Sequence, residues 1–125
     1  MLARLLVCGD KSQDVDAIVG LLGQESYQVE VSLQPFDALQ KLATSNFNAL
    51  ILSVRAGDSA WLTVISLINT LHAGLPLIVV TDDASLETER AARKGRIFYY
   101  LMKPIEEPEL KIVVKDAIRK SRSIG

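Results

Sequence analysis

The sequence predicts an α/β fold in which one parallel sheet of five strands is covered by helices on both faces. Short apolar runs that suit buried strands alternate along the chain with longer segments in which apolar residues recur at helical spacing. The segments that join them are short, so each strand returns to a parallel neighbour by a right-handed crossover through a helix. We therefore expect a doubly wound, three-layer sandwich with strand order 2-1-3-4-5.

The size and charge of the chain indicate one domain without a charge-driven partner. It has 125 residues, of which 49% are hydrophobic, and this is enough for one core and too little for two. We expect a core over about residues 3–120, followed by a tail or a severed linker at residues 121–125. Lys and Arg number 14 against 15 Asp and Glu, so the net charge of −1 favours neither nucleic acid nor an anionic membrane.

Cysteine usage and the N-terminal segment predict a cytoplasmic protein. Cys8 is the single cysteine and has no second Cys or His at metal-ligand spacing, so it suits a reducing compartment. The opening segment, MLARLLVCGD, is too short for the apolar region of a signal peptide and far short of the ~20 residues that cross a membrane. We expect no membrane contact.

The first strand is expected over residues 5–8, an apolar run that leaves Asp10 at its carboxyl end. A helix should then begin near Ser12 or Asp14 and stop at Gly23. Its buried stripe consists of Val15, Ile18, Val19 and Leu22.

The second strand is expected over residues 27–33, where apolar and polar residues alternate. This pattern is typical of a strand that is covered less completely than its neighbours, so we place it at an edge of the sheet. Pro35 is suited to open the next helix. The stripe that we expect this helix to bury consists of Phe36, Leu39, Leu42 and Ala43.

The third strand, residues 49–54, is an unbroken apolar run until Ser53. It has the profile of a central strand that is covered on both faces. In an open parallel sheet, ligands bind beyond the carboxyl ends of the strands, so the position of Ser53 should face the functional site.

The next helix, expected over residues 60–72, carries more apolar residues than one stripe needs. The stripe consists of Trp61, Val64, Ile65 and Ile68, and the surplus consists of Leu62, Leu67 and Leu71. We expect the sheet to cover the surplus widely; the alternative is that some of it faces a partner.

The fourth strand is expected over residues 77–80, with Thr81 at its tip, and a weakly anchored helix over residues 85–94. The fifth strand, residues 97–102, ends at Lys103.

The last helix has Pro108 at its start, and its expected stripe consists of Leu110, Val113, Val114 and Ala117. Cations gather toward its end at Lys115, Arg119, Lys120 and Arg122. They suit the negative end of the helix dipole, and we interpret them as solvated rather than as contacts to an acidic partner or to nucleic acid.

Polar residues stand at the ends of four of these strands. If the strands are parallel, the fold brings together Asp10, Ser53, Thr81 and Lys103, which the sequence scatters. The motifs around them are LLVCGD, ALILSV, LIVV followed by Thr81, and LMKP.

These motifs resemble those of the response-regulator receiver domains, the CheY-like family, over about residues 3–120. The resemblance implies a flavodoxin-like sandwich and a role in two-component signal transduction. In that family the first strand ends in two acidic residues that bind magnesium, and here these positions hold Gly9 and Asp10. The phosphate-accepting aspartate of the third strand is matched by Ser53.

The resemblance also assigns the remaining site positions. Thr81 matches the switch hydroxyl, Tyr100 the switch aromatic residue, and Lys103 the lysine that contacts phosphate. The Lys103-Pro104 pair resembles the cis X-Pro turn of the family.

The departures from the family pattern predict a degenerate receiver that is not an enzyme. Magnesium prefers an octahedral set of oxygen ligands with carboxylates among them, so Asp10 alone, with the Arg55 carbonyl, should bind it weakly or not at all. A serine hydroxyl without a base does not replace a carboxylate as acceptor, so Ser53 should stay unmodified. We expect no other cofactor, because the chain lacks the glycine-rich motif of a nucleotide site and the phosphate loop of a flavin site.

Lys103 then needs another partner, because a partly buried ammonium is costly without an acceptor. We hypothesise that it pairs with Asp10 or Asp82, the acidic residues that remain in the pocket, and donates a hydrogen bond to Ser53. The alternative for Asp82 is that it caps the following turn and points into solvent. A serine hydrolase is excluded by geometry, because the only histidine, His72, should lie at the opposite edge of the sheet.

We therefore expect a signalling module that acts by contact with other signalling proteins or domains, without nucleic acid. The expected surface is the face of the fourth helix, fifth strand and fifth helix, which would also serve as the contact surface of a homodimer. One alternative is an active receiver that phosphorylates another aspartate, among Asp58, Asp82 and Asp83. A second alternative is a sensor that binds a small ligand in the crevice at the strand tips.

Overall fold

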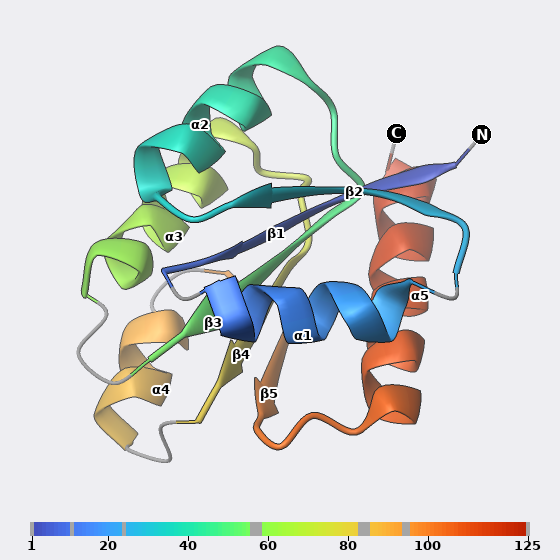
Figure 1. The fold of residues 1–125 in the computed structure, drawn as a ribbon. Coiled ribbons are helices and arrows are strands. Elements are labelled where there is room, and N and C mark those ends of the chain that lie inside the picture. The colour runs from blue at the N-terminus through green and yellow to red at the C-terminus, as the bar shows by residue number, and fades with distance from the viewer. Residues whose placement is uncertain are drawn as a thin grey trace.

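The computed structural model describes residues 2–10, 12–23, 25–55, 59–82, 86–93 and 96–124. Its core is a five-stranded sheet in the order β2-β1-β3-β4-β5 (Figure 1), in which all adjacent strands are parallel. The predicted fold class and strand order are therefore confirmed.

The elements lie close to the predicted ranges. The strands are β1 (Ala3–Gly9), β2 (Tyr27–Ser32), β3 (Ala49–Val54), β4 (Leu77–Thr81) and β5 (Tyr99–Met102). The helices are α1 (Ser12–Leu22), α2 (Pro35–Thr44), α3 (Ser59–Leu71), α4 (Leu86–Arg93) and α5 (Glu107–Ile124). Residues 121–124, where we expected a tail or linker, continue α5 as helix.

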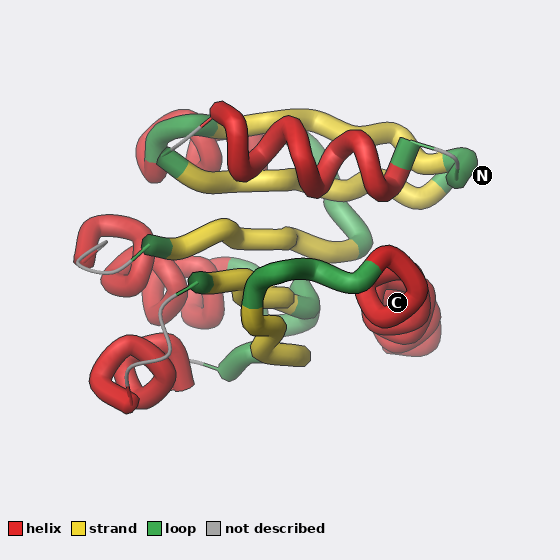
Figure 2. Tube along the Cα trace, turned by 60° about the horizontal axis from the view of Figure 1, so that its bottom comes forward, coloured by secondary structure: helices red, strands yellow, loops and turns green. Residues whose placement is uncertain are grey.

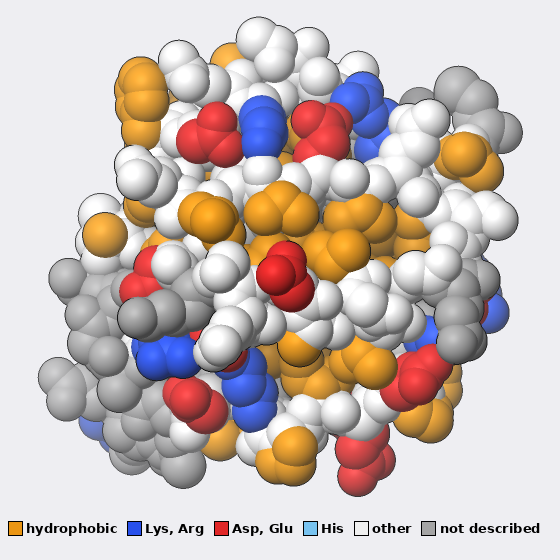
Figure 3. Space-filling model, in the orientation of Figure 1, with side chains coloured by type: hydrophobic (Ala, Val, Ile, Leu, Met, Phe, Trp, Pro, Cys, Tyr) orange, Lys and Arg blue, Asp and Glu red, His pale blue; other side chains and the backbone are white. Residues whose placement is uncertain are grey.

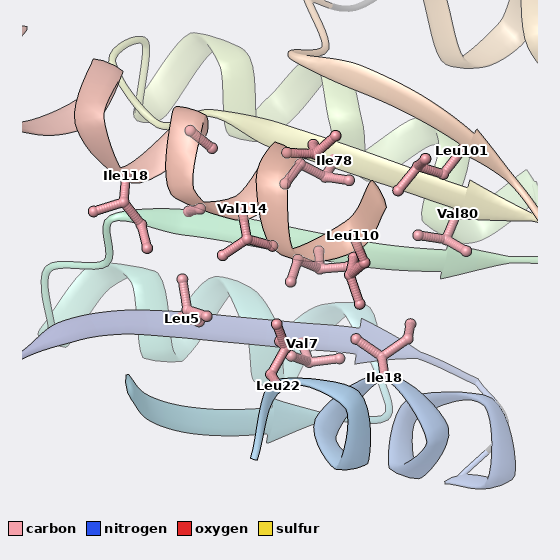
Figure 4. Packing of buried hydrophobic residues seen from close by; sticks show 14 of the residues in the cluster. Leu5, Val7, Ile18, Leu22, Ile78, Val80, Leu101, Leu110, Val114 and Ile118 are labelled. Atoms are coloured by element: carbon pink, nitrogen blue, oxygen red, sulfur yellow. The ribbon is translucent and has the colours of Figure 1, made fainter. Parts of the chain in front are cut away.

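Helices cover both faces of the sheet (Figure 2). On one face, α1 and α5 pack against inward-pointing side chains of β1, including Leu5 and Val7 (Figure 4). On the other face, α2 and α3, with Ala92 of α4, pack against Leu6, Cys8 and neighbouring strands. Every residue of β3 is buried, as predicted for a central strand covered on both sides.

β2 lies at one edge of the sheet, as its alternating sequence predicted. Most of its side chains are half-buried, and only Ser32 is fully buried. In the space-filling view, a band of hydrophobic side chains crosses the middle of the face that carries β2 and α1 (Figure 3). The partial burial of the β2 side chains agrees with a strand that has a neighbouring strand on one side only.

The predicted buried stripe of α2 is wrong in part. Phe36 is 70% exposed and Ala43 is exposed, whereas Ala38 and Leu42 are buried. Polar contacts with β2 set the rotation of α2 about its own axis. Ser32 donates a hydrogen bond to Asp37, and Lys41 donates one to the Val31 carbonyl. They hold that flank of α2 against β2, and the opposite flank faces solvent.

The expectation that the sheet covers the surplus apolar residues of α3 is wrong for two of the three residues. Trp61, Val64, Ile65 and Ile68 are buried as predicted, and Leu62 is partly buried. However, Leu67 is 44% exposed and Leu71 is 60% exposed, because a helix that lies on a sheet presents only one face to it.

Within the described residues, no helix is both long and apolar enough to cross a membrane.

Candidate functional site

The strand register brings the predicted polar residues to one edge of the sheet. Ser53 pairs in register with Gly9, Val54 pairs with Thr81, and the backbone amide of Lys103 donates a hydrogen bond of 2.8 Å to the Thr81 carbonyl. Ser53 and Thr81 are only 1% and 0% exposed. The carboxyl end of β3 is therefore buried between the neighbouring strands β1 and β4.

Lys103 reaches across this edge to Ser53. Its Nζ lies 3.2 Å from the Ser53 Oγ, and the ammonium donates this hydrogen bond. The predicted hydrogen bond between Lys103 and Ser53 is thus present. An ammonium has no lone pair with which to take the serine proton, so this contact does not make Ser53 a nucleophile.

The ion-pair partner of Lys103 is Asp14, whose Oδ1 lies 3.4 Å from the ammonium. Our hypothesis that Lys103 pairs with Asp10 or Asp82 is therefore wrong. Asp14 lies in the first turn of α1, beside the buried Val15, and this anchoring holds its carboxylate over the strand tips. Asp10 and Asp82 are exposed at the ends of their strands.

Asp14 also binds Arg55, which directly follows β3. The Arg55 Nε donates a hydrogen bond of 3.0 Å to the Asp14 Oδ2, so each carboxylate oxygen faces one cation. Burial acts to raise the pKa of Asp14, but the hydrogen bond from Arg55 and the charges of Lys103 and Arg55 together hold this pKa below its usual range. The carboxylate is therefore ionised and doubly paired at neutral pH.

Three of the described aspartates act on the pKa of Arg55. Its hydrogen bond to Asp14 is the main cause that raises its pKa, and the charges of Asp14, Asp82 and Asp10 add to this. From the sequence we expected only the carbonyl of Arg55 near the site, and we expected Asp14 at the start of a helix. A signal was present, since an acidic residue in the first turn after a strand tip stands at the same edge as that tip.

Gly9, at a position that the family resemblance assigns to an acidic residue, leaves little space for a side chain. A Cβ built on Gly9 would lie 3.1 Å from the Ser53 carbonyl oxygen, 3.1 Å from Val15 Cγ2 and 3.2 Å from Ser53 Cβ. These contacts are closer than ordinary van der Waals contact. In the part of the chain that the structure describes, no group of three His, Cys, Asp or Glu residues is arranged to hold a metal ion.

His72 lies at the opposite edge, as predicted. It follows the last residue of α3, its amide donates a hydrogen bond of 2.7 Å to the Ile68 carbonyl, and it shares a hollow with Phe47, just before β3. It is thus separated from Ser53 by the length of β3.

Comparison with known proteins identifies the family of this chain. A family model described as the response regulator receiver domain matches residues 5–115 of the chain. The chain belongs to this family.

Relatives of this receiver domain are regulatory proteins by name. The transcriptional regulatory protein ZraR of Salmonella typhimurium is 25% identical over 121 residues, which are 97% of this chain and 27% of that protein. The luminescence regulatory protein LuxO of Vibrio campbellii is 27% identical over 88 residues, which are 70% of this chain and 19% of that protein. The chain therefore spans less than a third of either relative.

Solved receiver domains have the same fold. A CheY-like response regulator receiver domain protein from Methanospirillum hungatei is 25% identical with a TM-score of 0.88, and the match covers 100% of both chains. The signal receiver domain of an HD domain-containing protein from Pseudomonas fluorescens has a TM-score of 0.89 at 22% identity, over 98% of this chain and 99% of that one.

The fifth strand of this receiver domain places its two tyrosines on opposite sides. Tyr99 is 42% exposed, whereas Tyr100 packs against the core beneath α3 and α4, with the Arg93 guanidinium 5.5 Å from the centre of its ring. The peptide bond between Lys103 and Pro104 is cis, as predicted. Asp58 and Asp83, two of the alternative acceptors, lie outside the described residues.

Proposed function

We propose that this receiver domain signals by protein contact without phosphorylation of its strand-tip site. The observation that carries the proposal is the set of contacts around Lys103, which donates a hydrogen bond to Ser53 and pairs with Asp14. Ser53 holds the position that the family resemblance assigns to the phosphate acceptor. The lysine expected to contact phosphate is thus already paired within the protein.

The chemistry of the acceptor supports this proposal. Acyl phosphate formation requires a carboxylate oxygen to attack phosphorus, and Ser53 offers a buried hydroxyl beside an ammonium instead. The carboxylate of Asp14, which pairs with the same lysine, has both oxygens engaged by cations. An attack by Asp14 would first have to break both ion pairs.

The same contacts argue against tight magnesium binding. Gly9 contributes no ligand, and a side chain there would need its neighbours to move. Asp14 is neutralised by Arg55 and Lys103, which leaves the exposed Asp10 and Asp82 as the described carboxylates near this edge. A hard divalent ion with so few oxygen ligands is held weakly.

The surface that we propose for partner contact is the face of α4, β5 and α5. Tyr99, Met102 and Ile112 expose large apolar side chains there, by 42%, 41% and 60%. Tyr99 and Ile112 also line a hollow of about 470 Å³ beside the acidic Glu109 and Asp116. Contiguous apolar surface with a charged rim is typical of protein interfaces. The partner is another signalling protein or a second copy of this domain, in the cytoplasm.

Phosphorylation independence is tested by incubating the domain with acetyl phosphate or beryllofluoride and Mg²⁺. We expect no gain of a phosphoryl group in the intact mass and no chemical-shift changes around Thr81 and Lys103. Asp82→Asn serves as the matched variant, because it removes the described alternative acceptor. A stable mass gain that is lost in Asp82→Asn would overturn the proposal in favour of an active receiver.

The proposed surface is tested by Ile112→Lys, which places a charge on the exposed apolar face without touching the core. The variant should lose self-association or partner capture while its thermal stability is unchanged. Leu71→Lys on α3 is the matched control, since Leu71 is equally exposed at 60% and lies on another helix. An equal loss in both variants would argue against this face.

A further inference from the structure

Another hollow lies at the edge of the sheet opposite the strand-tip site. It has a volume of about 420 Å³ and lies where β1 and β2 begin, against the C-terminal half of α5. Ala3 and Tyr27, the first residues of these strands, contribute to its lining. Figure 1 shows the start of β1 beside the end of α5. A volume of this size is within the range of small-molecule sites.

Three cations from α5 line this hollow. Lys115, Arg119 and Arg122 follow one another at spacings of four and three residues, which places them on one face of the helix. The described residues that line the hollow include no carboxylate. A local concentration of positive charge in a chain of net charge −1 attracts anions to this place.

The helix dipole does not account for all of these cations. Its effect is confined to the last turn of a helix, and Lys115 lies well before the end of α5 at Ile124. Arg119 also contacts Asp116 at 3.5 Å, an exposed pair between neighbouring residues of one helix, and such pairs contribute little. These cations are therefore not only solvated charges of one helix, because they line the same hollow.

The rest of the lining suits the uncharged part of a ligand. Ala3 and Ile118 are buried at 4% and 7% exposure and form an apolar floor. Tyr27 and Ser26 add an aromatic ring and two hydroxyl groups. Burial and the charge of Glu25 raise the pKa of Tyr27, so its hydroxyl remains a hydrogen-bond donor. Aromatic rings stack on planar groups, and guanidinium groups bind phosphate through paired hydrogen bonds.

We propose that this hollow binds a small phosphorylated ligand with a planar ring, such as a mononucleotide. The phosphate contacts Lys115, Arg119 and Arg122, and the ring lies against Tyr27 and the apolar floor. The site is separate from the strand-tip residues and does not depend on how the domain signals.

The probe for the test is GMP, with guanosine, inorganic phosphate, duplex DNA and anionic lipid vesicles as comparison arms. Binding is measured by isothermal titration calorimetry and by chemical-shift mapping on the intact domain. The expected result is that GMP binds more tightly than inorganic phosphate or guanosine alone and shifts resonances of Tyr27 and Ile118.

The double variant K115Q/R122Q should weaken GMP binding by at least about tenfold, as expected when charged hydrogen bonds are lost. Lys120→Gln is the matched control, because Lys120 is a cation of the same helix that lies over the Phe98 ring and does not line the hollow. It should leave binding unchanged, and circular dichroism should show that all variants are folded.

Three outcomes would overturn the proposal. The first is no GMP binding at millimolar concentration. The second is an equal loss in Lys120→Gln, which would indicate diffuse charge rather than a site. The third is binding of DNA or vesicles through these cations without binding of GMP.

Discussion

Asp14→Asn tests the ion network that closes the strand-tip site. The substitution keeps the shape of the side chain and removes the charge that pairs with Lys103 at 3.4 Å. The Lys103 side chain is only 18% exposed, so the variant leaves a largely buried ammonium with neutral acceptors such as Ser53 and without its anionic partner. Leaving a buried charge unpaired is destabilising, whereas exposed pairs contribute little.

The expected loss in the free energy of unfolding is about 1–2 kcal/mol, between the values for exposed and buried charge pairs. For a domain of this size, such a loss lowers the melting temperature by about 3–8 °C. Thermal unfolding followed by circular dichroism at pH 7 measures this difference. Asp16→Asn is the matched control, because Asp16 is an exposed residue two positions further along α1.

The pH dependence gives the sharper test. The pKa of Asp14 is lower in the folded protein than in the unfolded chain, so its contribution to stability is complete above the ordinary pKa of an aspartate, about 4. This contribution is lost as the pH falls through the lowered folded value. The gap between the melting temperatures of the wild type and Asp14→Asn should therefore close in acid. A gap that is the same at pH 7 and in acid, or an equal loss in Asp16→Asn, would refute the reasoning.

Three further predictions concern the packing around the site and the core. Gly9→Asp should destabilise the domain by about 1–3 kcal/mol in urea unfolding, because its Cβ would crowd Ser53 and Val15; unchanged stability would show that the neighbours give way freely. Ile68→Ala should lower the free energy of unfolding by about 2–5 kcal/mol, because Ile68 is buried in α3. Leu67→Ala should lower it by less than about 0.5 kcal/mol, because the neighbouring Leu67 is 44% exposed. Similar losses in the two variants would contradict the orientation of this helix. Burial raises the pKa of the Cys8 thiol, so iodoacetamide should modify Cys8 slowly in the native protein and rapidly in denaturant. Mass spectrometry measures the labelling, and rapid labelling of the native protein would contradict the burial of Cys8.

Much of the fold was predictable from local patterns. The apolar runs identified the central strands, the alternating residues identified β2 as an edge strand, and the strand tips located the candidate site. These features depend on which face of a strand or helix is apolar, and the sequence states this directly. The strand order predicted that Ser53 lies at a strand tip, and the need of the partly buried Lys103 for an acceptor predicted the hydrogen bond between them.

The tertiary structure decided which residues meet between elements. Asp14 rather than Asp10 or Asp82 pairs with Lys103, because the packing of α1 on the sheet sets where its first turn lies relative to β3 and β5. In the same way, contacts between α2 and β2 turned Phe36 into solvent, and the approach of α5 to the start of β1 formed the cationic hollow. Local periodicity fixes the apolar face of an element, but the rotation and offset of one element against another depend on packing over the whole core. The sequence by itself therefore determined the sheet and the edge at which its strands end. Only the folded chain decided which charged residues pair at that edge.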